Sequence, residues 1–171
     1  MKVGDIIEDF EYEAYHNGKF VKGKLSDHEG KWVVLFFYPL DFTFVCPTEI
    51  RGFASKMGEF EKEGAVIIGA STDSVHSHKR WFESDFKEVG FSVIGDTSRK
   101  ISEQFDVLQE DGTALRGTFI ISPDGILKYM VVSDNNVGRS VEETLRVLKA
   151  LKTGALCPVE WKPGEATIKA V

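Results

Sequence analysis

An uninterrupted apolar run at residues 32–38, WVVLFFY, constrains this chain more than any other stretch. The run is too short for a stable helix and does not alternate with polar residues, so it predicts a strand covered on both faces. Pro39 ends the strand, because proline has no N–H to donate to a β-ladder. The chain must then turn into a helix near Pro47, since proline is favoured at the first helical position. A buried central strand followed by a helix is typical of a layered α/β fold.

Cys46 lies at about the N-cap of this predicted helix. Free backbone N–H groups and the positive end of the helix dipole stabilise an anion there, so we expect the thiolate form of Cys46 to be favoured. The dipole alone contributes about 0.3–1 kcal/mol, so a cation must supply the rest, and arginine is the natural donor. An arbitrary cysteine is usually an ordinary buried thiol, but this position predicts a nucleophile.

Composition limits the partners and the compartment. The chain has 171 residues, 42% of them hydrophobic, and a formal net charge of −6, which fits one globular domain and argues against nucleic-acid binding. It has no apolar run of about 18 residues and no signal peptide, so we expect no membrane contact and a cytoplasmic location. Cys46 and Cys157 are too far apart for a CxxC motif, and in a reducing compartment they favour catalytic or redox use over a structural disulfide.

Strand and helix signals alternate along the rest of the chain. Turn residues predict two β-hairpins, one over residues 9–24 and one around residues 123–125. Ser140 and Glu143 predict a capping box at the start of the last helix. The order of elements predicts a mixed central sheet with helices on both faces, then an extended tail without periodicity. Further strands are expected at residues 65–70 and 91–94, and helices at residues 47–64, 71–86, 98–105 and 140–154.

Pro39, Thr43 and Cys46 form the pattern P-x-x-x-T-x-x-C, which resembles the active-site motif of peroxiredoxins. The surrounding FYPLDFTFVCPTE is similar to the typical two-cysteine branch, and most of all to the peroxidase component of bacterial alkyl hydroperoxide reductases. The resemblance implies a thioredoxin-like fold, with a domain over residues 1–153 and a C-terminal tail over residues 154–171. Matching segments extend along nearly the whole chain: residues 71–73, His78 with Trp81, and residues 94–96, 116–119, 137–140 and 157–164.

This resemblance implies a thiol-specific peroxidase that acts in antioxidant defence without haem, metal or flavin. It would reduce hydrogen peroxide and organic hydroperoxides to water and alcohols. Cys46 would be the peroxidatic nucleophile and would pass through a sulfenic acid. Cys157 would be the resolving cysteine and form an intersubunit disulfide with Cys46. Either an NADH-dependent flavoprotein disulfide reductase or thioredoxin would reduce that disulfide, and homodimers would assemble into a decamer.

Five further residues match positions with roles in the family. Arg116 would stabilise both the thiolate and the peroxide. The Thr43 hydroxyl would accept from the thiol or donate to a peroxide oxygen. Pro39 would shield the sulfur from water and rigidify the loop. Glu49 and Arg139 would form a supporting pair that holds the active-site arginine in place.

Simpler interpretations exist for several residues. Without the family match, Arg116 is most easily explained as a surface charge and Thr43 as a turn residue. His76 and His78 form an H-x-H pattern, but no third ligand lies at a usual spacing, so a solvated helix start is expected rather than a metal site. Trp161 is expected to pack the tail against a neighbouring subunit.

Two other functions compete with peroxidase action. General disulfide exchange is disfavoured because a CxxC motif is missing. The non-enzymatic alternative is a holdase chaperone or a scaffold. The resemblance implies this alternative, since large rings in this family can act in that way. Phe42 and Phe44 near the active-site loop are candidate interface anchors, since exposed aromatic residues often dominate binding energy.

Overall fold

Seven strands form a single mixed sheet in the computed structural model, which describes residues 1–170. The order across the sheet is β2-β1-β5-β4-β3-β6-β7. β3 and β5 both run parallel to β4, whereas β1, β6 and β7 pair antiparallel with their neighbours. The strands are β1 (Glu11–His16), β2 (Lys19–Lys24), β3 (Trp32–Phe37), β4 (Ala65–Ser71), β5 (Ser92–Gly95), β6 (Arg116–Ile121) and β7 (Leu127–Ser133). The predicted mixed sheet and both hairpins are confirmed.

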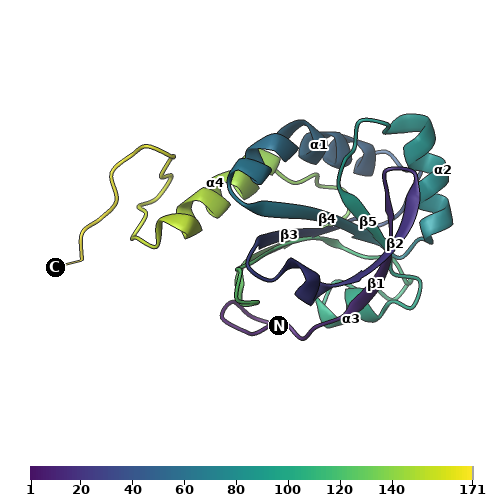
Figure 1. The fold of residues 1–171 in the computed structure, drawn as a ribbon, viewed down its shortest axis with the longest axis horizontal. Coiled ribbons are helices and arrows are strands. Elements are labelled where there is room, and N and C mark those ends of the chain that lie inside the picture. Colours follow the sequence, from purple (N-terminus) through teal and green to yellow (C-terminus); the bar gives the residue numbers. More distant parts are fainter. Residues whose placement is uncertain (171) are drawn as a thin grey trace.

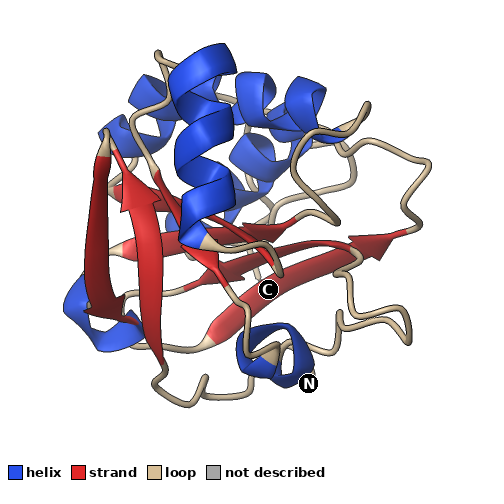
Figure 2. Cartoon of the chain, turned by 90° about the vertical axis from the view of Figure 1, so that its right-hand side faces the viewer, coloured by secondary structure: helices blue, strands red, loops and turns tan. Residues whose placement is uncertain are grey.

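Helices cover both faces of the sheet (Figures 1 and 2). On one face lie α1 (Cys46–Lys62), α2 (Val75–Asp85) and α4 (Val141–Thr153). The other face carries the short α3 (Lys100–Gln104) and a 3-10 helix, η1 (Leu25–His28). Beyond α4 the chain extends away from the sheet (Figure 1). Within residues 1–170, no helix combines the length and the apolarity that a membrane crossing requires.

Side chains of β3 alternate between the two faces and so belong to two separate hydrophobic clusters. Residues 33–37 are all 3% exposed or less, which confirms the prediction of a strand covered on both sides. Burying one such side chain contributes about 1.5–3 kcal/mol, so this strand anchors the fold. Val34, Phe36 and Tyr38 pack beneath α1, α2 and α4, and Val33, Leu35 and Phe37 pack on the opposite face.

The last helix and the tail differ in detail from expectation. The Ser140 hydroxyl caps α4 by accepting from the backbone N–H of Glu143 at 3.1 Å. The Glu143 carboxylate accepts from Arg146 instead of returning to the cap, so only half of the predicted capping box forms. Trp161 is 4% exposed within its own chain, and its carbonyl oxygen accepts from Arg146. The expectation that Trp161 packs against a neighbour is therefore wrong: it packs the tail against its own subunit.

Candidate active site

Cys46 is the first residue of α1, which follows β3 through the loop of residues 38–45, and it is fully buried. The N-cap is Val45, one residue earlier than predicted, because its carbonyl oxygen already accepts the first helical hydrogen bond, from the N–H of Glu49. Pro47 lies in the first turn as predicted. The sulfur remains at the positive end of the helix dipole, where an anion is stabilised.

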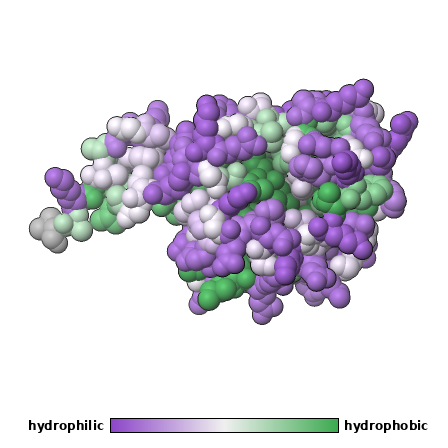
Figure 3. Space-filling view, viewed as in Figure 1, coloured by the Kyte–Doolittle hydropathy of each residue, from purple (hydrophilic) through white to green (hydrophobic). Residues whose placement is uncertain are grey.

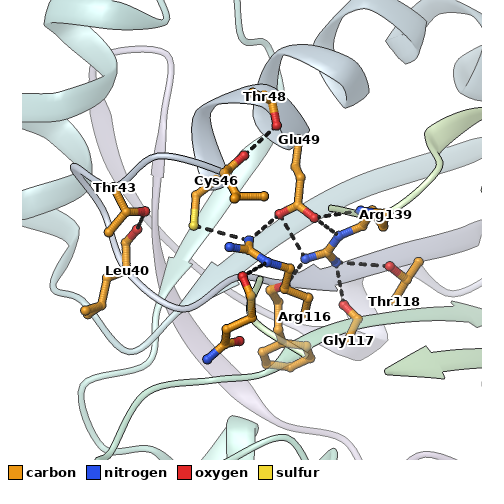
Figure 4. Close-up of polar contacts among 12 residues, drawn as sticks. Leu40, Thr43, Cys46, Thr48, Glu49, Arg116, Gly117, Thr118 and Arg139 are labelled. Carbon is orange, nitrogen blue, oxygen red and sulfur yellow. Dashed lines mark hydrogen bonds and ion pairs between the residues drawn. The ribbon is translucent and has the colours of Figure 1, made fainter. Parts of the chain in front are cut away.

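The guanidinium of Arg116 is the cation beside this sulfur (Figure 4). Arg116 begins β6, and because β6 runs antiparallel to β3, its first residue lies beside the end of β3. Its Nη1 lies 3.3 Å from Cys46 Sγ, and its Nε donates to the carbonyl oxygen of Asn135 at 2.9 Å. Arg116 is 4% exposed, so its interpretation as a surface charge is wrong.

Glu49 joins two buried arginines one turn further along α1. Its Oε2 accepts from Arg116 Nη1 at 2.7 Å, and its Oε1 accepts from Arg139 Nε at 2.8 Å (Figure 4). All three side chains are at most 4% exposed. Two guanidinium groups and one carboxylate leave one net positive charge in the protein interior. A thiolate at Cys46 neutralises that charge, which is the strongest electrostatic reason for the ionised form.

Arg139 is held from several sides. Burial lowers the pKa of its guanidinium, and the charge of Glu49 opposes this shift. The remaining N–H groups bind the strands beneath, so the side chain has no freedom to turn away. Its acceptors there are the carbonyl oxygens of Gly117 and Phe37 and the hydroxyl of Thr118.

The loop between β3 and α1 carries Pro39 and Thr43. Pro39 is buried and Thr43 half-buried. Thr43 Oγ1 donates to the carbonyl oxygen of Leu40 at 2.9 Å (Figure 4). Its proton is therefore used within the loop, and only its lone pairs are available to another donor. No hydrogen bond joins Thr43 to Cys46 in the described part of the chain.

Cys157 lies in the tail, half-buried against the last turn of α4. Its Sγ is 3.5 Å from Thr153 Oγ1 and donates to the carbonyl oxygen of Ala150 at 3.8 Å. Both cysteines are free thiols in this structure. The geometry therefore brings together Cys46, Glu49, Arg116 and Arg139, and leaves Cys157 in a separate region.

His78 lies in a different environment from the one that the sequence predicts. The expected solvated helix start describes His76, which is exposed, but His78 is fully buried. Helical spacing could have found it, because His78 lies midway between Val75 and Trp81 on the apolar face of α2. No pattern in the sequence marks Asp41, in the loop before α1, as the partner of His78. Their Nδ1 and Oδ2 atoms lie 2.7 Å apart.

Comparison with known proteins places this geometry in a family. Residues 3–130 match the AhpC/TSA family. The 2-Cys peroxiredoxin BAS1 of Spinacia oleracea is 48% identical, over 98% of this chain and 67% of the relative. The structure of reduced Plasmodium vivax 2-Cys peroxiredoxin covers 99% of this chain and 93% of its own, with a TM-score of 0.95 and 32% identity. Mycobacterium bovis AhpC gives a TM-score of 0.87 at 37% identity, covering 95% of this chain and 98% of its own.

These similarities extend from the sheet to the tail and agree with the fold. The matched solved structures are peroxiredoxins, whose fold is thioredoxin-like, and this chain has the same mixed sheet with helices on both faces. The family match alone covers most of the chain. The chain therefore belongs to the AhpC/TSA family and is a typical two-cysteine peroxiredoxin, a thiol peroxidase that reduces peroxides.

Proposed function

We propose that Cys46 is the peroxidatic nucleophile of this peroxidase. The single observation that carries the proposal is the 3.3 Å contact between Cys46 Sγ and Arg116 Nη1 in a buried site. The thiolate attacks one peroxide oxygen, so that an S–O bond forms while the O–O bond breaks. The departing oxygen takes the electron pair and a proton and leaves as water or an alcohol, and Cys46 becomes a sulfenic acid.

The surrounding residues act on the charge that moves in this step. Negative charge passes from the sulfur to the departing oxygen, and Arg116 is near enough to donate to either. Glu49 and Arg139 orient that guanidinium. Thr43 Oγ1 retains lone pairs and accepts from the protonated peroxide oxygen, and the buried Pro39 excludes water from the sulfur.

Arg116→Met is expected to slow the first step by about 10²- to 10³-fold, the usual cost of removing one donor to a developing oxyanion. The measurement is single-turnover peroxide consumption without a reductant. Arg80→Met is the matched control, since Arg80 is exposed on α2. The Arg80→Met protein should consume peroxide at the wild-type rate. Equal rates for the two variants would remove Arg116 from the mechanism.

Cys157 is proposed as the resolving cysteine. Its thiol attacks the sulfenic sulfur of Cys46 in a second subunit, expels water and forms an intersubunit disulfide. Two features support this role: the thiol is half-buried and free, and the tail after residue 153 extends away from the sheet (Figure 1). Residues 1–153 are proposed as the catalytic domain and residues 154–171 as the segment that delivers Cys157.

Non-reducing gel electrophoresis after one equivalent of hydrogen peroxide tests the resolving step. The wild type should give a covalent dimer in which mass spectrometry finds Cys46 joined to Cys157. The Cys157→Ser protein should stay monomeric on the gel with Cys46 as a sulfenic acid, and a second equivalent of peroxide should convert that sulfenic acid to sulfinic acid. A monomeric wild type with oxidised Cys46 and an intact Cys157 thiol would instead assign a one-cysteine mechanism.

The reductant and the assembly are also proposals. A low-potential dithiol returns two electrons to the disulfide, and thioredoxin or an NADH-dependent flavoprotein reductase is proposed as its source. Figure 3 shows hydrophobic patches set in a mostly hydrophilic surface. Phe42 and Phe44 are 60% and 94% exposed, which supports assembly of homodimers into a decamer through such side chains. The proposed compartment is the cytoplasm.

A further inference from the structure

A buried polar network fastens the loop that leads into α1. Asp41 is 7% exposed, and its Oδ1 accepts from the Tyr38 hydroxyl at 2.7 Å. Its Oδ2 accepts from Ser77 Oγ at 2.7 Å and lies 2.7 Å from His78 Nδ1. The backbone N–H of Asp41 donates to Asp73 Oδ2 at 2.9 Å. One loop residue is thus bound by both its side chain and its main chain.

Each ring nitrogen of His78 faces an acceptor. Nε2 lies 3.0 Å from the carbonyl oxygen of Ile94, which can only accept, so Nε2 carries a proton. The Asp41 carboxylate receives a hydroxyl donor at each oxygen, and its Oδ2 is also the acceptor that faces Nδ1. Burial, and then the charge of Asp41, raises the pKa of Tyr38, so the phenol remains a donor. This arrangement of acceptors at both ring nitrogens is the one that a buried imidazolium–carboxylate pair would make.

We propose that the buried ion pair between His78 and Asp41 positions the loop of residues 38–45 for peroxide binding. This inference rests on the proposed role of Cys46. Pro39 and Thr43 each lie two residues from Asp41, so the pair restrains the segment that would contact the peroxide. The restraint comes from α2 and, through the carbonyl of Ile94, from β5.

The elements behind the pair are themselves tightly packed. A Cβ atom on Gly95 would lie 2.7 Å from the backbone nitrogen of Val75, so the start of α2 touches the end of β5 with no room for a side chain. His78 therefore projects from a helix that cannot shift towards the sheet. A rigid support of this kind is what a positioning residue needs.

Two separate networks hold the two halves of the site. Glu49, Arg116 and Arg139 fix the charge beside the sulfur, and none of their hydrogen bonds reaches Asp41 or His78. Loss of the His78 side chain should therefore misalign the peroxide while the thiolate persists. The peroxide rate and the intrinsic thiolate reactivity should separate in a suitable variant.

The charge of His78 is tested on the wild-type protein by ¹⁵N spectra of histidine side chains at neutral pH. The chain contains 4 histidines, and comparison with His78→Gln assigns the relevant signals. Both ring nitrogens of His78 should be protonated. A neutral ring with the proton on Nε2 alone would overturn the ion pair, and this result does not depend on enzyme activity.

The positioning role is tested by the reaction of Cys46 with two reagents. His78→Gln should lower its rate constant with hydrogen peroxide by about 10- to 100-fold, the cost of a misplacement of roughly 1 Å. Its rate of alkylation by iodoacetamide, which depends on the thiolate and on access to Cys46 but on no hydrogen bond to a peroxide, should match the wild type. Leu148→Ala is the control for lost stability, because Leu148 is a fully buried residue of α4 and its substitution should leave both rates unchanged.

Three results would overturn the positioning role. One is an unchanged peroxide rate in His78→Gln, and another is an equal loss of both rates in that variant, which would mean that the pair supports the thiolate. The third is an equal loss of peroxide rate in Leu148→Ala. A wild type whose Cys46 does not react with peroxide would instead contradict the proposed function, and the spectra of His78 would still report on the pair.

Discussion

Cys46→Ser is expected to abolish peroxide reduction. The serine hydroxyl stays protonated beside Arg116, and its oxygen cannot be oxidised to an equivalent of the sulfenic acid. In other enzymes with covalent catalysis, removal of the nucleophile costs roughly 10⁶-fold in turnover. The substitution changes one atom at a fully buried position, so the fold should persist.

Peroxide consumption in a single turnover measures this loss. The matched control is Cys157→Ser, which removes the other thiol and should still consume one equivalent of peroxide per chain. Circular dichroism of both variants checks that the fold is retained. Consumption by Cys46→Ser at the wild-type rate would show that another group reacts with the peroxide.

Glu49→Gln is expected to destabilise the protein by about 3–5 kcal/mol, because removing one member of a buried ion pair leaves the opposite charge uncompensated. Here two guanidinium groups are affected, since Glu49 binds both Arg116 and Arg139. The amide retains the size and one acceptor oxygen of the carboxylate. The effect therefore reports the charge and not a cavity.

Urea unfolding of the reduced protein gives the free energy for this comparison. Glu143→Gln is the control, because Glu143 pairs with Arg146 at 2.6 Å and their side chains are 45% and 29% exposed. Exposed pairs contribute about 0–1 kcal/mol, so this variant should unfold near the wild-type midpoint. A similar loss of unfolding free energy in both variants would mean that the buried ion pairs of Glu49 stabilise the protein no more than an exposed pair does.

Local signals predicted most of the fold. The apolar run of β3, the turn at Asn17 and the hydroxyl of Ser140 each act within a few residues, and the structure contains the strand, the hairpin and the helix start that they indicate. The positions of helix ends were predicted less exactly. The N-cap of α1 is Val45 and not Cys46, because Val45 can supply the first accepting carbonyl without a capping side chain.

The active site depends on contacts that local patterns do not encode. Arg116 meets Cys46 across 70 positions of sequence, and nothing around Arg116 distinguished it except its resemblance to the family. The pair of His78 and Asp41 joins a helix to a loop 37 positions away. Such pairs follow from the order of strands in the sheet. That order brings the C-terminal ends of β3 and β5 and the N-terminal end of β6 to one region.

The buried arrangement of Glu49, Arg116 and Arg139 makes the pocket electrically neutral only while Cys46 is reduced and ionised. A sulfenic acid carries no charge, so oxidation leaves the interior with an unmatched cation, which is costly in a low-dielectric site. In the proposed reaction, oxidation of Cys46 therefore destabilises the first turn of α1. We expect this electrostatic trigger to open the helix start after each encounter with peroxide, and to keep it closed until then.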